Sequence, residues 1–146
     1  MKIVAVLCTY NEASNLPDVV SKLRRAVPGI GILVADDDSP DKTAEIAKKL
    51  GAEVLSRINL PRGRGLAGRE GYSRALELGA DAILEMDADG SHDPGEAPGL
   101  LEALQKFDIA IGSRSSEVGG GDERGPIRRM VSGGAKVFLK MILGLH

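Results

Sequence analysis

The sequence predicts an α/β domain in which a mostly parallel sheet is flanked by helices. Two observations lead to this fold class. Continuous apolar runs, typical of strands covered on both faces, alternate with segments whose apolar residues recur at helical spacing. The connections are short, and such alternation gives parallel strands joined by right-handed crossovers. A chain of 146 residues is long enough for one domain with a single core.

Five strands are predicted, at residues 3–8, 30–35, 53–56, 82–86 and 108–113. The first helix is expected to follow the first strand with Ser14 as its cap. Its apolar face would comprise Leu16, Val19, Val20, Leu23 and Val27.

The remaining helices are marked by their ends. The second is expected to have Ser39 at its cap, Pro40 in its first turn and Gly51 just after its end. A third helix would run from about Leu66 to Gly79, and a fourth, weakened by glycines, would fall within residues 94–107.

Beyond Ser113 the chain is glycine-rich, and a last helix is expected over roughly residues 127–143. Its broad apolar face lies opposite Arg129, Lys136 and Lys140. Such a helix fits two arrangements, packing against the sheet or lying in a membrane interface. We therefore divide the chain into a core, residues 1–126, and an amphipathic segment, residues 127–146.

The composition excludes several classes of function. The net charge of −2 would not attract a polyanion, and 3% aromatic residues with no Trp leave no stacking platform for single-stranded nucleic acid. Cys8 is the single cysteine, which excludes an internal disulfide and fits a reducing compartment. The sequence has no signal-peptide pattern and no apolar run of about eighteen residues. We expect a cytoplasmic protein, at most peripheral to the inner face of the membrane.

Polar residues follow the carboxyl ends of four predicted strands, where ligands bind in parallel sheets. They are Thr9–Glu12, Asp36–Asp38, Asp87–Asp89 and Arg114. Between residues 57 and 74, five arginines stand against one acid, Glu70, so this stretch is expected to face an anion. A solvated surface is the alternative for the basic stretch.

Asp87 and Asp89 are the strongest chemical signal. Residues two apart in an extended segment point the same way, so both carboxylates are expected to converge. Hard oxygen ligands with open positions suit Mg²⁺ or Mn²⁺ shared with substrate phosphates. The alternative is a capped turn, since Asp and Gly favour turns.

Taken in order, the motifs "CTYNE", "ADDDSPDKT", "EMDADGSHDP" and "IGSR" resemble family 2 glycosyltransferases of the GT-A fold. Within that family the likeness is greatest to polyprenyl-phosphate (dolichol-phosphate) mannose synthases. It extends to about Ser132. The ordered set of motifs is specific, whereas the Asp-x-Asp pair alone is weak.

The resemblance implies roles for individual residues. The donor nucleotide sugar would be held by Cys8, Tyr10, Glu12, Ala35, Asp37 and Asp87. The ligands of a Mg²⁺ or Mn²⁺ ion would be Asp87, Asp89 and Ser91. The catalytic residues would be Asp89, Arg114 and Arg128, and the acceptor would be bound by Arg114, Arg128 and Ser132.

The implied activity is inverting transfer of a hexose, mannose from GDP-mannose, to a polyprenyl or dolichyl phosphate. Alternatives are a UDP-sugar donor or a glycan hydroxyl acceptor. The likeness also implies a membrane-associated enzyme with no nucleic-acid partner, and the last helix could support a homo-oligomer. Three departures from the family pattern are Cys8, where relatives usually have Pro, Ser91, where relatives often carry an amide or another polar ligand, and the end at His146, where relatives continue. From the last of these we expect the chain to be truncated.

A remote alternative is an NAD-binding protein, because "GRGLAG" at residues 63–68 matches a dinucleotide fingerprint and Asp87 follows nineteen residues later. The fingerprint should begin directly after a strand. Here "RINLPR" intervenes, and two earlier clusters of acids would remain unexplained.

Overall fold

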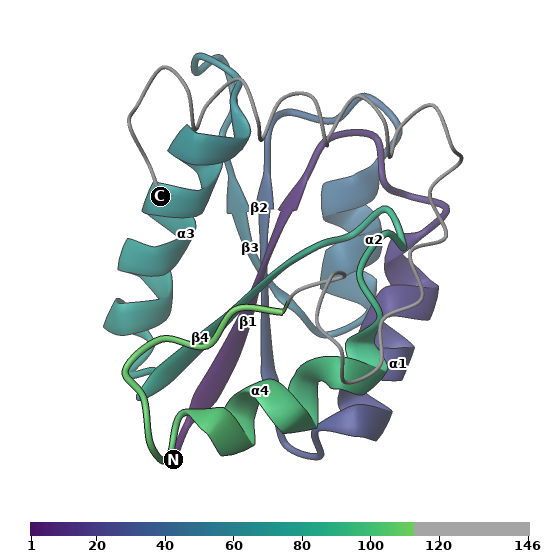
Figure 1. Cartoon of the computed structure of the whole chain (residues 1–146). Coiled ribbons are helices and arrows are strands. Elements are labelled where there is room, and N and C mark those ends of the chain that lie inside the picture. Colours follow the sequence, from purple (N-terminus) through teal and green to yellow (C-terminus); the bar gives the residue numbers. More distant parts are fainter. Residues whose placement is uncertain (113–146) are drawn as a thin grey trace, which may run out of the picture. The chain divides into compact units, whose positions relative to one another are not determined.

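The structure, a computed structural model, describes residues 1–112 (Figure 1). Within these residues the sheet has four parallel strands in the order β3-β2-β1-β4. The strands are β1 (Ile3–Thr9), β2 (Gly31–Asp36), β3 (Glu53–Ser56) and β4 (Ala82–Asp87). The predicted fold class is therefore confirmed. The bounds of four of the five predicted strands agree with the observed strands to within one residue at each end.

Helices cover both faces of this sheet. Helices α1 (Leu16–Ala26), α2 (Thr43–Lys49) and α4 (Ala97–Ala103) pack on one face, with a short 3₁₀ helix η1 (Pro94–Glu96) preceding α4. Helix α3 (Arg64–Glu77) packs on the opposite face, against β1 and β2 (Figure 1).

Strand β1 supplies both halves of the core, because its side chains alternate between the faces. Ala5 and Leu7 join the cluster beneath α1 and α2, whereas Val4 and Val6 join Ala75 beneath α3. All four β1 residues are buried. This two-sided burial explains why the strand appears in the sequence as a continuous apolar run.

Helix α3 lies unusually close to the sheet at Gly71. A Cβ atom placed on Gly71 would come within 2.7 Å of Val6 Cγ1. Gly68, one turn earlier, is also buried. Gly71 lies outside the pattern at residues 63–68 that imitates a dinucleotide fingerprint, and of the glycines within that pattern only Gly68 packs against other side chains, those of Tyr72 and Cys8.

The predicted fifth strand is wrong in its described part, residues 108–112. The Ile109 side chain is 76% exposed, and no other strand within residues 1–112 pairs with this run. An apolar run forms a strand only where a neighbour completes its backbone hydrogen bonds.

Two predicted helix caps are also wrong. Helix α1 has Asn15, not Ser14, at its N-cap. Helix α2 begins at Thr43, because Ser39 donates from its backbone N and from Oγ to the Asp36 carboxylate (2.9 and 2.6 Å) and so belongs to the preceding turn. The predicted end of α2 is confirmed, with Gly51 at a left-handed φ of 70°.

Among residues 1–112, no helix is long and apolar enough to cross a membrane. The predicted division at residue 126 and the last helix lie outside the described residues.

Candidate active site at the carboxyl edge of the sheet

Three residues predicted to bind the donor lie in one row across the sheet. Cys8, near the end of β1, is in register with Ala35 of β2 on one side and with Asp87 of β4 on the other. One residue further along, Thr9 is in register with Asp36. The carboxyl ends of β1, β2 and β4 therefore meet at one edge, where parallel sheets bind their ligands.

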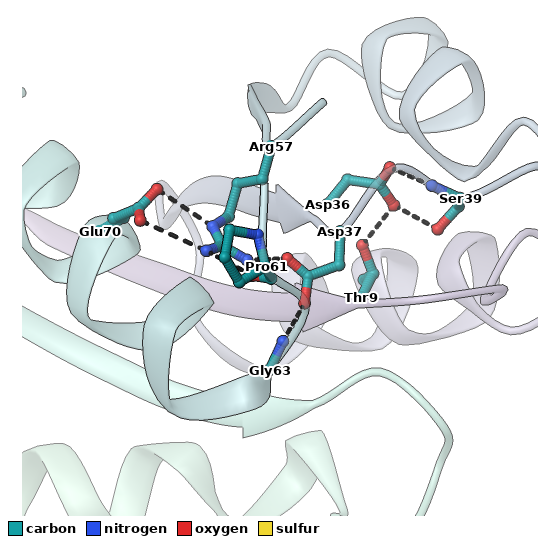
Figure 2. Close-up of polar contacts among 8 residues, drawn as sticks. All are labelled: Thr9, Asp36, Asp37, Ser39, Arg57, Pro61, Gly63 and Glu70. Atoms are coloured by element: carbon teal, nitrogen blue, oxygen red, sulfur yellow. Dashed lines mark hydrogen bonds and ion pairs between the residues drawn. The ribbon is translucent and has the colours of Figure 1, made fainter. Parts of the chain in front are cut away.

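The turn after β2 is built around the Asp36 carboxylate. Its Oδ1 accepts hydrogen bonds from Thr9 Oγ1 (2.9 Å) and from Ser39 Oγ (Figure 2). Asp36 is buried and bonded to protein groups through both oxygens. It links the end of β1 to the turn after β2.

The segment after β1, which contains Tyr10 and Glu12, is fixed to the start of α2. Asn11 N donates to Ser39 Oγ, and Glu12 N donates to Thr43 Oγ1, each at 3.0 Å. Ala13 N donates to Asp41 Oδ2 at the same distance. Through these bonds the motif "CTYNE" and the motif "ADDDSPDKT" form one rigid rim.

Tyr10 presents its ring at this rim and is 42% exposed. The Arg62 guanidinium lies 4.4 Å from the ring centroid, and Arg62 Nη1 donates to the Tyr10 hydroxyl (2.9 Å). The ring and the guanidinium are both surfaces on which a planar group can stack.

Asp37 adjoins the same edge but is buried. Its carboxylate accepts hydrogen bonds from Arg57 Nη1 and from the backbone N of Gly63 (2.8 Å) (Figure 2). Arg57 also bonds to Glu70 of α3, and these contacts raise the pKa of its guanidinium, the Glu70 hydrogen bond contributing most.

Asp87 closes β4 with its carboxylate about one-third exposed. Arg64 Nε donates to Asp87 Oδ1 (2.8 Å), and Arg64 Nη2 lies 3.2 Å from Glu85 Oε1. His92 Nδ1 accepts a hydrogen bond from the Asp87 backbone N (3.1 Å), which links the end of β4 to the turn that follows it. The Arg64 guanidinium is therefore the cation paired with the β4 carboxylates.

Asp89 lies in the bend beyond β4, yet exposure still alternates there. Met86 and Ala88 are buried, whereas Asp87 is partly exposed and Asp89 exposed. Because β4 ends at Asp87 and residues 88–90 form a bend, the convergence of the two carboxylates stays a prediction. Hydrogen bonds from the Ser91 side chain and backbone lower the pKa of Asp89, so it is an anion at neutral pH.

The side-chain oxygens of Asp87, Asp89 and Ser91 fit a hard divalent cation. Two carboxylates and a hydroxyl, at the end of β4 and in the exposed bend that follows it, are oxygen ligands that leave several coordination positions for phosphate oxygens. Within residues 1–112, no group of three or more His, Cys, Asp or Glu side chains is placed to hold a metal ion by itself.

Cys8 is not a candidate nucleophile. Burial and the neighbouring Glu85 carboxylate raise the pKa of the Cys8 thiol to about 11, so the thiol stays protonated at neutral pH. Its place in the register row suits a small residue that lines the site.

Arg114, Arg128 and Ser132 lie outside the described residues. Of the residues that sequence reasoning assigned to no role in the site, Arg57 and Arg64 are the most important. Arg64 was indicated by the basic composition of residues 57–74, but a buried Arg57 paired with Glu70 leaves no periodic signal in the sequence.

A parallel α/β domain that gathers carboxylates, an exposed aromatic ring and arginines at the carboxyl edge is typical of proteins that bind phosphorylated nucleotides. The chain belongs to glycosyl transferase family 2, whose family model matches residues 4–144. The predicted family is therefore confirmed.

Three curated relatives share about two-fifths of their aligned residues with the chain. It is 40% identical to undecaprenyl-phosphate mannosyltransferase of Micrococcus luteus over 100% of its own length. It is 39% identical to polyprenol monophosphomannose synthase of Mycolicibacterium smegmatis and 38% identical to dolichol-phosphate mannosyltransferase of Pyrococcus furiosus, over 97% and 92% of its length. The chain spans 62%, 56% and 39% of these relatives, respectively.

Solved structures of the GT-A type share the fold. One is glucosyl-3-phosphoglycerate synthase from Mycobacterium tuberculosis, in complex with Mn²⁺, UDP and glucosyl-3-phosphoglycerate. The match has a TM-score of 0.58 and 26% sequence identity, and it covers 73% of this chain and 40% of the synthase chain. Mannosyl-3-phosphoglycerate synthase from Rubrobacter xylanophilus gives a TM-score of 0.56 at 30% identity, over 73% of this chain and 37% of its own.

Proposed function

We propose that this chain holds the donor-binding core of a metal-dependent, inverting glycosyltransferase. It would move a hexose, mannose from GDP-mannose, to a polyprenyl phosphate. The observation that carries the proposal is the row formed by Cys8, Ala35 and Asp87, next to the exposed Asp89. The names of the three curated relatives, all mannose transferases or synthases for polyprenyl phosphates, support the acceptor class.

The donor nucleotide would lie along the rim formed by residues 8–12 and 35–37. The Tyr10 ring offers a stacking face, and Glu12 offers a hydrogen-bond acceptor. Asp87, Asp89 and Ser91 would hold a Mg²⁺ or Mn²⁺ ion, which supplies Lewis-acid stabilisation of the leaving nucleoside diphosphate. A Mn²⁺–UDP complex in the related M. tuberculosis structure supports this donor chemistry.

Arg64 would change its partner when a donor binds. With the acids of β4 occupied, its guanidinium becomes available for the diphosphate, which planar donors bind well. Arg64 is more than half exposed, so its side chain has room to move. The positive charge would then remain beside the leaving group throughout the reaction.

The acceptor phosphate is already an anion at neutral pH, so its attack on the anomeric carbon needs no general base. It needs cations that overcome repulsion between acceptor and donor, a role we assign to Arg114 and Arg128, with Ser132 beside them. In-line displacement at that carbon inverts its configuration.

A thermal-shift panel tests donor binding. The full chain is heated with GDP, UDP or NAD, each with and without Mn²⁺. A ligand at a hundred times its dissociation constant adds about 2.7 kcal/mol to the free energy of unfolding. Metal-dependent stabilisation by GDP supports the proposal, UDP preference favours the alternative donor, and stabilisation by NAD without metal contradicts both.

Transfer itself is measured with GDP-mannose and a short polyprenyl phosphate. Product that forms only with the lipid phosphate supports the proposed acceptor, whereas product only with a glycan points to a hydroxyl acceptor. We also propose peripheral contact of residues 127–146 with the inner membrane face. Failure of the chain to float with anionic liposomes would contradict that contact.

A further inference from the structure

The segment that joins β3 to α3, residues 57–63, begins with a fully buried cation. Arg57 is 2% exposed, and its guanidinium bonds to three different parts of the chain. Nη1 donates to the Asp37 carboxylate, Nε donates to Glu70 Oε2 (3.0 Å), and Nη2 donates to the carbonyl of Pro61 (3.2 Å) (Figure 2).

Asp37 connects both ends of this segment. One of its oxygens accepts from Arg57, the first residue of the segment, and the other accepts from the backbone N of Gly63, the last (2.8 Å). The segment is thus closed into a loop, with its start and end fixed to the turn after β2. Glu70 fixes Arg57 to the first half of α3 as well.

The end of this loop and the start of α3 carry the two arginines that reach the candidate site. Arg62 lies against Tyr10, and Arg64, the first residue of α3, pairs with Asp87. Both side chains are exposed, so solvent would leave them free to move if the backbone beneath them were free. The backbone beneath them is bonded to the buried ion pair of Arg57 and Asp37, and Arg57 in turn bonds to the partly exposed Glu70.

Burying an ion pair is weak evidence for stability, because apolar residues of similar volume would serve a core as well or better. The five N–H groups of a guanidinium, in a planar fork, instead suit the simultaneous fixing of several acceptors. The acceptors here come from the turn after β2, from the loop itself and from α3.

We infer that Arg57 is a positioning residue for the donor diphosphate. Held by Asp37 and Glu70, it fixes residues 57–63 so that Arg62 and Arg64 stand ready beside Tyr10 and Asp87. This inference rests on the proposed function, because it takes a nucleoside diphosphate as the ligand that these arginines meet.

The first test uses Glu70→Gln, which keeps the shape of the side chain but removes its charge. Hydrogen–deuterium exchange of the full chain is expected to be faster at the amides of residues 58–64 and unchanged in β1 and β2. The matched control is Arg74→Gln, which removes the ion pairs of Arg74 with Glu53 of β3 and with Glu77 of the same helix and leaves the bonds to the loop intact. Equal exchange in Glu70→Gln and wild type would overturn the inference.

The second test measures affinity for GDP with Mn²⁺ by calorimetry. Glu70→Gln is expected to bind about tenfold more weakly, the effect of one charge-assisted hydrogen bond, while Arg74→Gln binds like wild type. Arg57→Lys keeps the positive charge but loses the planar fork of N–H groups, so it should also bind GDP with Mn²⁺ more weakly than wild type. In a transfer assay KM for the donor should rise while kcat changes little.

A double variant separates positioning from general destabilisation. If Glu70 and Arg57 act through Arg64, then Glu70→Gln adds little to the loss already caused by Arg64→Gln. Fully additive losses would contradict the inference. Should wild type bind no nucleoside diphosphate with Mn²⁺, the proposed function fails, and the exchange experiment still decides whether the buried group holds the loop.

Discussion

The two acidic turns at the edge of the sheet look alike in sequence and differ in structure. After β2, Asp36 and Asp37 are buried, and their oxygens accept hydrogen bonds from protein donors. After β4, Asp87 is partly exposed and Asp89 is exposed, and among residues 1–112 the cation paired with Asp87, apart from His92, is the more than half-exposed side chain of Arg64. The density of acids therefore does not identify a ligand site. The β2 carboxylates are buried and bonded within the protein, whereas the β4 carboxylates remain open to solvent and to a ligand.

The largest effect is expected when the β2 turn loses a carboxylate. Asp37→Ala leaves the buried Arg57 with one anion fewer, so we expect the free energy of unfolding to fall by about 3–5 kcal/mol. Chemical denaturation followed by circular dichroism measures the loss. The control is Asp38→Asn, an exposed neighbour at a φ of 59° that Asn tolerates, expected within about 0.5 kcal/mol of wild type. A stable Asp37→Ala protein would erase the contrast between the turns.

The β4 turn is expected to respond in the opposite way. Asp89→Ala should leave the stability of the unliganded chain within about 0.5 kcal/mol of wild type. It should remove the Mn²⁺-dependent part of the stabilisation by GDP, up to about 2.7 kcal/mol at a hundred times the dissociation constant. Glu45→Ala, exposed on α2, serves as the control. If GDP stabilises Asp89→Ala as it does wild type, the ligand assignment is wrong.

A smaller effect, on the affinity for Mn²⁺, is expected when Arg64 beside Asp87 is replaced. Without nucleotide, a divalent ion must displace the Arg64 guanidinium from Asp87 Oδ1. An exposed pair of this kind contributes about 0.2–1 kcal/mol, so Arg64→Gln should bind Mn²⁺ up to about fivefold more tightly. Electron paramagnetic resonance of free Mn²⁺ measures the affinity. Arg69→Gln, on the same helix, should not change it, and weaker Mn²⁺ binding by Arg64→Gln would count against competition.

The smallest effect concerns Cys8, which lies between the two turns. Its thiol pKa is raised to about 11 mainly by burial and secondarily by Glu85. Alkylation by iodoacetamide needs the thiolate, so the rate should be low at pH 8 and rise as the pH approaches 11. Glu85→Gln should shift this profile slightly downward, whereas Glu77→Gln should not. A profile centred near the ordinary thiol value would show that the site is open to water.

Much of the fold could be predicted because each strand carries its own signal. Runs such as residues 3–8 are apolar throughout, and Gly51 and Gly79 end their helices at positive φ. The fifth strand was predicted from the same local signal. It failed in its described part because pairing depends on a neighbour, which a local run does not reveal.

The candidate site was predictable at the strand ends and not between them. The clusters Thr9–Glu12, Asp36–Asp38 and Asp87–Asp89 follow from the rule that the ends of parallel strands meet. Cys8 and Ala35 were implied by the family resemblance, and the register places them in one row with Asp87.

The role of Arg57 depends on Asp37 and Glu70, which are distant in the sequence. Ser39 bonds to the nearby Asp36 and accepts from the distant backbone N of Asn11. Sequence reasoning assigned Ser39 to a helix cap and placed Arg57 in a basic stretch expected to face an anion, with a solvated surface as the alternative.

The missing side chain at Gly71 has a consequence for the far end of its helix. Gly71 lets α3 touch Val6, and Arg64 begins the same helix about 10 Å away along its axis. Because an α-helix is stiff, a shift of α3 away from the sheet at Gly71 also displaces its first residue. A methyl group at position 71 would thus tune how far Arg64 reaches, from inside the core and with every residue of the edge left intact.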